Sequence, residues 1–324
     1  MYLDYHYHEG ASTGEIRSDL IAVLTGESDP ANLSASCDKT KTSLITSVPA
    51  GWSLHDPAVD SYADVIKAPV SDDPTQPKYV SLYLNSTILY LKVHQDWDAT
   101  THTTTNTLTN SESSYGLVIS TIYPGRICMS ASSNYIAVMS EYTNRDTQAN
   151  GITRGCSNAD SGPLLVTERT RAMPWDTVEN GYIPFLWSPI GTVALNRAST
   201  LSQSLKYSQA KYNYQPHSQD TTDYAVNVFH PIGEGVNSDT SLRQPTSTPG
   251  EYSSFVVPLH ACDANSSDNT AYLGELTAKC GIYVGPRYSL PDYHELNLNS
   301  TPYIAWPVGV AHASYGGIVF VPKE

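Results

Sequence analysis

Short stretches in which apolar and polar residues alternate, each closed by Gly, Pro, Asn or Ser, recur along most of this chain. The clearest are KYVSLYL at residues 78–84 and ILYLKVH at residues 88–94, which are separated by Asn85-Ser86-Thr87. A period of two places successive side chains on opposite faces of an extended strand. Two such stretches joined by three turn-forming residues predict a β-hairpin with a three-residue connection.

The rest of the chain supports the same fold class. It is rich in Thr, Tyr and Val, only 15% of its residues are charged, and it contains 21 prolines and 20 glycines. Thr, Tyr and Val are typical of strands, and Pro and Gly are typical of tight turns. Further strands are predicted at residues 115–121, 126–132, 134–142, 163–171, 224–229, 254–259, 281–284, 303–306 and 317–321.

One segment near the start predicts a helix instead. Ser12 and Glu15 have the spacing of a capping box, apolar residues then recur every three or four positions, and Gly26 is suited to the position just past a helix end. Asp29-Pro30 predicts a second short helix that continues towards residue 33 or past residue 37. We therefore expect a mainly β, α+β fold: antiparallel and β-rich, with a small N-terminal helical element.

A Thr-, Asn- and Ser-rich segment at residues 98–114 has almost nothing to bury. It suggests a division into an N-terminal region of helix plus hairpin, residues 1–110, and a β-rich body, residues 111–324. The alternative is one continuous domain.

Charge and segment lengths exclude several functions. The chain of 324 residues has 18 basic and 32 acidic residues and a net charge of −14, so we expect it to bind no specific nucleic acid. Its apolar runs are much shorter than a membrane span, so no membrane insertion is expected. The opening MYLDYHYHEG has neither the basic nor the apolar part of a signal peptide, which predicts synthesis in the cytoplasm.

The five cysteines are irregularly spaced and contain no Cys-x-x-Cys pair, which excludes a zinc ribbon or finger. An odd number with no regular spacing predicts buried free thiols and no essential disulfide.

The stretch CSNADSGPLLV, residues 156–166, resembles the serine segment of trypsin-type proteases. Ser161 would be the nucleophile, but the one His-x-Cys candidate, His260, follows it in the chain, whereas the protease family places its histidine first. Pro163 also stands where that family has a second glycine, and proline has no N–H for an oxyanion hole. A turn that leads into a strand is the favoured interpretation, and a serine hydrolase remains an alternative.

No other cluster predicts chemistry. His6 and His8 would share one face of an extended strand, but no carboxylate or cysteine group completes a metal site around them. Phosphate-binding loops, dinucleotide fingerprints and zinc-protease motifs are absent from the sequence. We therefore expect no metal, no cofactor and no catalytic residues.

The opening ten residues contain Tyr2, Tyr5 and Tyr7. In an extended arm Tyr5 and Tyr7 share one face and Tyr2 lies on the other. Exposed rings on a free arm would be stabilised by burial against a neighbour, so we expect these three tyrosines to form a subunit contact, and deletion of residues 1–9 to weaken assembly more than folding. The alternative is that the arm folds back on its own domain as a short edge strand.

Several stretches, in this order and spacing, resemble a poorly characterised group of virion structural proteins of tailed bacteriophages. They are YHYHEGASTGEIRSDLIAVLTGESDPANLSASCDKT, VPAGWSLHDPAV, KAPVSDDPTQPKYVSLYL, HQDWDATTHTTTN, MPWDTVENGYIPFLW, PLHACDANSS and the terminal YIAWPVG…GGIVFVPKE.

This resemblance implies a non-enzymatic virion subunit in the tail, baseplate or neck, with copies of itself and other virion proteins as its partners. The chain has 23 tyrosines and only 4 phenylalanines. Tyrosine buries apolar area and keeps a hydroxyl for hydrogen bonding, which suits partly hydrated protein–protein interfaces. A receptor- or carbohydrate-binding virion module, in which the aromatic rings would stack on the ligand, is the alternative.

Overall fold

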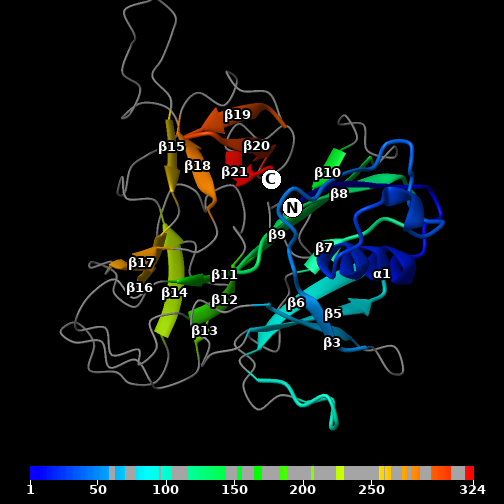
Figure 1. Ribbon diagram of the computed structural model, residues 1–324, viewed down its shortest axis with the longest axis horizontal. Coiled ribbons are helices and arrows are strands. Elements are labelled where there is room, and N and C mark those ends of the chain that lie inside the picture. The colour runs from blue at the N-terminus through cyan, green and yellow to red at the C-terminus, as the bar shows by residue number, and fades with distance from the viewer. Residues whose placement is uncertain are drawn as a thin grey trace, which may run out of the picture.

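The computed structural model describes residues 1–57, 63–69, 78–94, 96–103, 116–143, 279–284, 293–307 and 318–324, together with eight strands between residues 152 and 275 (Figure 1). Within this part of the chain the fold is mainly antiparallel β-sheet with one α-helix and one short 3-10 helix. The predicted fold class, β-rich with a small N-terminal helical element, is confirmed.

The described strands form four sheets, and every pair of neighbouring strands is antiparallel. The long sheet has the order β12 (Ile183–Trp187), β11 (Leu164–Arg169), β9 (Ile136–Thr143), β8 (Gly125–Ala131), β1 (Tyr2–Tyr7) and β2 (Ser43–Ile45), with β10 (Ile152–Arg154) also on β9. The second sheet has the order β3 (Ser53–Asp56), β4 (Asp64–Lys67), β5 (Tyr79–Asn85), β6 (Ile88–His94) and β7 (Gly116–Val118).

The remaining strands belong to the C-terminal half of the chain. The C-terminal sheet has the order β15 (Phe255–Pro258), β18 (Gly281–Val284), β21 (Ile318–Pro322), β20 (Thr301–Pro307) and β19 (Glu295–Leu298). A four-stranded sheet has the order β13 (Lys206–Tyr207), β14 (Tyr224–Phe229), β16 (His260–Asp263) and β17 (Tyr272–Glu275). A strand overlaps each of the segments that sequence alternation predicted.

The predicted hairpin forms with a shorter connection than expected. Asn85 pairs with Ile88, so only Ser86 and Thr87 form the turn. Ser86 has a φ of 57°, a left-handed conformation that lets two residues reverse the chain without a third.

The helix α1 (Thr13–Leu24) begins and ends where its caps were predicted. The Ser12 hydroxyl accepts from the Glu15 N–H at 3.4 Å. At the other end the N–H groups of Gly26 and Glu27 donate to the carbonyls of Val23 and Ala22, the pattern of a Schellman motif. The second predicted helix is only the 3-10 turn η1 (Pro30–Asn32), capped by the Asp29 carboxylate.

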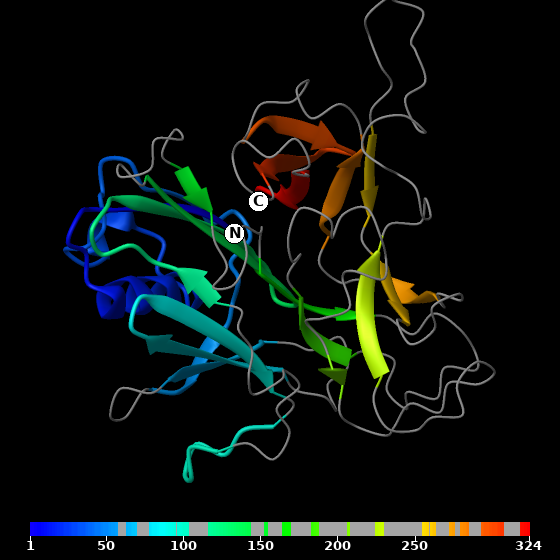
Figure 2. The same ribbon diagram turned by 180° about the vertical axis from the view of Figure 1, so that it is seen from behind.

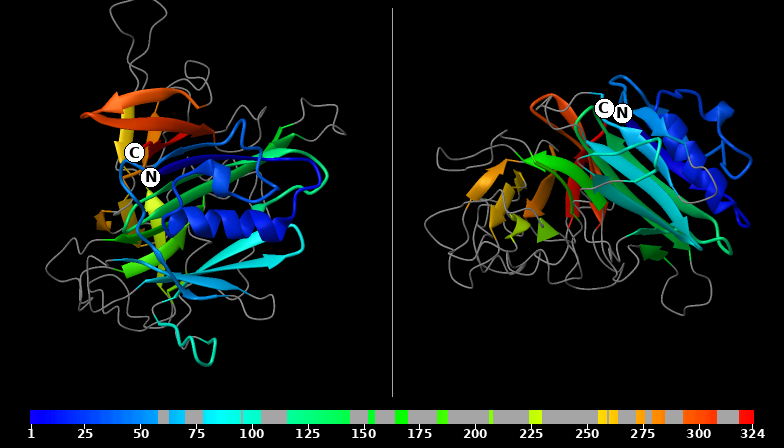
Figure 3. Two further views of the ribbon diagram at one scale, coloured as in Figure 1. Left: turned by 45° about the vertical axis from the view of Figure 1, so that its right-hand side comes forward. Right: turned by 90° about the horizontal axis from the view of Figure 1, so that it is seen from below.

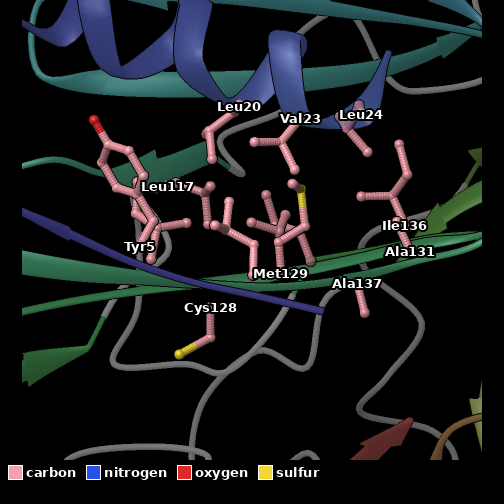
Figure 4. Packing of buried hydrophobic residues seen from close by; sticks show 14 of the residues in the cluster. Tyr5, Leu20, Val23, Leu24, Leu117, Cys128, Met129, Ala131, Ile136 and Ala137 are labelled. Atoms are coloured by element: carbon pink, nitrogen blue, oxygen red, sulfur yellow. The ribbon is translucent and has the colours of Figure 1, made fainter. Parts of the chain in front are cut away.

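The sheets and the helix form layers. α1 lies between the long sheet and the second sheet, and β19 to β21 lie beyond the other face of the long sheet (Figure 3). Seen from behind, the strands of the long sheet run diagonally across the molecule between these layers (Figure 2). Side chains of α1, β8 and β9 fill the space between the helix and the long sheet, where Leu20, Val23 and Met129 face one another (Figure 4).

Strand pairing crosses the division predicted at residue 110. β7, at residues 116–118, is hydrogen-bonded to β6 in the second sheet, and β1 is paired along its whole length with β8, at residues 125–131. Both sheets therefore contain strands from each side of residue 110. Strand pairing over long sequence distances overrides the composition of the intervening segment.

Candidate functional site

The N-terminal arm with its three tyrosines is an inner strand of the long sheet. β1 pairs with β8 over six residue pairs and with β2 over three. The exposed fractions of Tyr2, Tyr5 and Tyr7 are 2%, 0% and 1%. The predicted subunit contact through these rings is thus not supported, because the chain's own core covers them. The arm does fold back on its own domain, but as an inner strand, not the edge strand of the alternative.

Tyr5 and Tyr7 lie on the α1 side of the sheet, and both hydroxyls are hydrogen-bonded there. Tyr5 donates to the buried carboxylate of Asp19 in α1 at 2.6 Å. Asp19 also accepts from the N–H and the hydroxyl of Ser34, at 2.8 and 2.7 Å. The Tyr7 hydroxyl accepts from the Ser120 N–H at 3.2 Å, and its ring lies so close to Gly125 that a Cβ would collide with it. These contacts fix the arm against the helix layer.

The opposite face of the long sheet carries a charged group that we call the Arg126 cluster: Asp4, Arg126, Glu141 and Tyr293. Arg126 donates from Nε and Nη2 to the two carboxylate oxygens of Asp4, at 2.6 and 2.8 Å. Its Nη1 lies 3.7 Å from Glu141 Oε1, and its guanidinium lies over the Tyr293 ring at 3.8 Å. The Tyr293 hydroxyl donates to Glu141 at 2.5 Å. The cluster therefore links β1, β8 and β9 to the residue that leads into β19.

Burial and pairing set the protonation states in the Arg126 cluster. Burial alone would raise the pKa of Asp4, but hydrogen bonds from His6 and Arg126 outweigh it and hold that pKa at about 2. Burial raises the pKa of the Tyr293 phenol, with further increases from the neighbouring Cys128 and Glu141. Asp4 is therefore a carboxylate and Tyr293 a neutral phenol at neutral pH.

A second polar group, the Asp56 cluster, lies on the second sheet and consists of Asp56, Trp97, His102, His94 and Ser81. Asp56, at the end of β3, is 3% exposed and accepts from Trp97 Nε1 at 2.7 Å. His102 Nδ1 lies 2.9 and 3.0 Å from its two oxygens. Trp97 also packs against His94, with ring centroids 5.0 Å apart. The segment after β6 thus reaches back across the sheet to β3.

His94 and Ser81 form a buried pair within this cluster. Ser81 Oγ lies 2.8 Å from His94 Nε2, and both residues are buried. Burial lowers the pKa of His94 to about 4, with a smaller decrease from Lys92 that Asp96 partly offsets. His94 is therefore neutral at pH 7, and its bond with Ser81 connects β5 and β6.

In the described part of the chain, the Asp56–His102 pair is the arrangement that most resembles a catalytic or metal-binding group. When a neutral His102 donates its Nδ1 proton to a buried carboxylate, Nε2 is left as an acceptor, as in a general base or a metal ligand. The side chain of His102 is half exposed. Ser81, however, is bonded to His94 and not to His102, and the described residues contain no group of three or more potential metal ligands. Among the residues that the structure describes, the geometry therefore defines an oriented histidine without a nucleophile or a second metal ligand beside it.

The structure describes only some of the other residues that the sequence analysis named as candidates for catalysis, metal binding or disulfides. Asp160, Ser161 and Pro163 lie outside the described residues, and for His260 only the backbone of β16 is described. His6 Nε2 lies 3.1 Å from Asp4 Oδ1, at the edge of the Arg126 cluster. Of the cysteines, Cys37, Cys128 and Cys280 are described, and all three are buried free thiols.

Comparison with known protein families and with curated proteins finds no match for this chain. Within the described residues, α1 is too short and too polar to cross a membrane.

Sequence reasoning missed both clusters because their members are far apart in the chain. Asp4 and Arg126 are 122 positions apart, and Asp56 and His102 are 46 apart. A signal for the second cluster was nevertheless present. Asp56 lies in VPAGWSLHDPAV, and Trp97 and His102 lie in HQDWDATTHTTTN, two of the stretches on which the phage resemblance rests.

Proposed function

We propose that the chain is a structural, non-enzymatic subunit of a tailed-bacteriophage virion. It would be a component of the tail, baseplate or neck that acts through contacts with copies of itself and with other virion proteins. The observation that carries the proposal is the ordered set of resembling stretches, and their described parts include elements of the fold. The aromatic opening is β1, the capped segment is α1, and two further stretches meet at Asp56.

The described tyrosines and tryptophans support assembly over ligand binding. Every one of them whose side chain the structure describes is buried or half-buried. Their rings stack within the chain, as Tyr83 and Tyr90 do at 4.9 Å, or donate to carboxylates, as Tyr5 does. A receptor- or carbohydrate-binding module needs open ring faces for stacking, so the described surface gives that alternative no specific support.

The proposal is tested on purified particles of the virus that encodes this chain. Peptide mass spectrometry after density-gradient purification should find the chain in a fixed ratio to the major virion proteins. Salt washes that remove adsorbed host protein should leave this ratio unchanged. A chain that is abundant in the infected-cell lysate but absent from washed particles would contradict the proposal.

A further inference from the structure

The face of the long sheet that points away from α1 is covered by the C-terminal sheet. Ser130 in β8 donates to the carbonyl of Pro322 at 2.6 Å, and the Lys323 ammonium lies over the Tyr2 ring at 5.8 Å. Tyr2 and Trp306 pack with ring centroids 6.4 Å apart. Cys128, on the same face, is fully buried. This interface joins residues from the two ends of the chain, whose termini lie close together (Figure 1).

One residue at this interface has a strained backbone conformation. Tyr293 has a φ of 60°, in the left-handed region that bulky residues rarely adopt. Its N–H donates to the Ala305 carbonyl of β20 within the C-terminal sheet. Its side chain makes two contacts across the interface: the ring lies under Arg126, and the hydroxyl donates to Glu141. The Tyr293 side chain thus helps to hold the C-terminal sheet against the long sheet.

The interface also leaves two polar atoms poorly paired. Tyr2 Oη and Trp306 Nε1 are buried and form no hydrogen bond of normal geometry. Their rings pack together, so each group exchanges its bonds to water for at most one weak bond between the two. On the α1 face of the same strand the Tyr5 hydroxyl is fully bonded to Asp19. The two faces of β1 therefore differ in how well their buried polar groups are satisfied.

We propose that the C-terminal sheet is a separable unit, which detaches from the long sheet while α1 and the second sheet stay folded on its other face. Detachment returns the Tyr2 and Trp306 polar atoms to water, which recovers part of its free-energy cost, whereas opening the α1 face breaks the Tyr5–Asp19 bond without such a gain. Proteins open locally and sub-globally at free energies below that of global unfolding. The detached state exposes Tyr2, Arg126 and Cys128 as a new surface. This device does not depend on the chain being a virion subunit.

Adjacent residues of β8 provide a matched pair of probes. Cys128 points towards the C-terminal sheet and Met129 towards α1 (Figure 4). Burial raises the pKa of the Cys128 thiol to about 12, so a maleimide reacts with it only after opening. The full chain is exposed to N-ethylmaleimide under native conditions, and labelling of each cysteine is followed by peptide mass spectrometry. A Cys128→Ala, Met129→Cys variant reports on the α1 face.

Cys128 should be labelled at least about tenfold faster than the thiol at position 129, with a weaker dependence on urea. Tyr293→Phe removes the hydrogen bond to Glu141 and should raise the Cys128 rate about tenfold, as loss of a bond to a charged group implies, without changing the rate at 129. Equal rates at 128 and 129, both following global unfolding, would overturn the proposal, as would a Tyr293→Phe effect of equal size at both positions.

Discussion

Arg126→Met removes the cation that Asp4, Glu141 and Tyr293 share, and it should destabilise the chain strongly at neutral pH. One pKa unit corresponds to about 1.4 kcal/mol, so the decrease of the Asp4 pKa from its ordinary 3.8 to about 2 is worth about 2.5 kcal/mol, shared between Arg126 and His6. Loss of the cation–π contact between Arg126 and the Tyr293 ring lowers the free energy of unfolding by about a further 1 kcal/mol. Because both carboxylates also stay partly buried without Arg126, we expect the free energy of unfolding to fall by about 2–4 kcal/mol.

The pH dependence separates this mechanism from a general loss of packing. A carboxyl whose pKa is lowered on folding stabilises the fold fully above its unfolded pKa, and this stability is lost as the pH falls through the folded value. The Asp4 contribution is therefore complete at pH 7 and falls to about half at pH 3. Urea unfolding followed by tryptophan fluorescence at both pH values measures it. Lys39→Met, which removes an exposed cation bonded only to a backbone carbonyl, is the control. An effect of Arg126→Met that is equal at pH 7 and pH 3 would refute the reasoning.

Three further predictions concern other parts of the chain. Deletion of residues 1–9 removes an inner strand, so the product should lose cooperative unfolding and near-ultraviolet circular dichroism; a folded, monodisperse product on size exclusion would contradict the assignment of β1. The pKa of buried His94 is lowered to about 4, so stability should fall by about 2.5 kcal/mol as the pH drops from 6.5 to 4, and His94→Gln should flatten this part of a urea-midpoint profile. Ser161→Ala should leave particle assembly and infectivity unchanged because Pro163 cannot donate to an oxyanion; labelling of Ser161 by a fluorophosphonate would show otherwise.

Features set by neighbouring residues could be predicted from the sequence. The hairpin of β5 and β6 depends on alternation within two short stretches and on the turn between them. The ends of α1 depend on Ser12 and Gly26, whose hydrogen bonds span only a few positions. Even here the turn was predicted one residue too long, because the left-handed conformation of Ser86 is not visible in its residue type.

Features set by distant partners could not be predicted. β1 is an inner strand only because β8, more than 115 positions away, lies beside it. An aromatic arm has the same composition whether it is buried in its own core or against a neighbouring subunit, so the burial of Tyr5 had no local signal. The Arg126 and Asp56 clusters likewise need pairings that residue spacing does not reveal, although two resembling stretches contained the residues that meet at Asp56.

The most direct test of the proposed function is a cryo-EM map of the intact particle of the virus that encodes this chain. We predict repeated density in the tail, baseplate or neck that fits α1 between the long sheet and the second sheet, with β1 between β2 and β8 and with protein contacts to neighbouring copies. A map at side-chain resolution in which every density is accounted for by other proteins would contradict the assignment of this chain as a structural subunit of the virion.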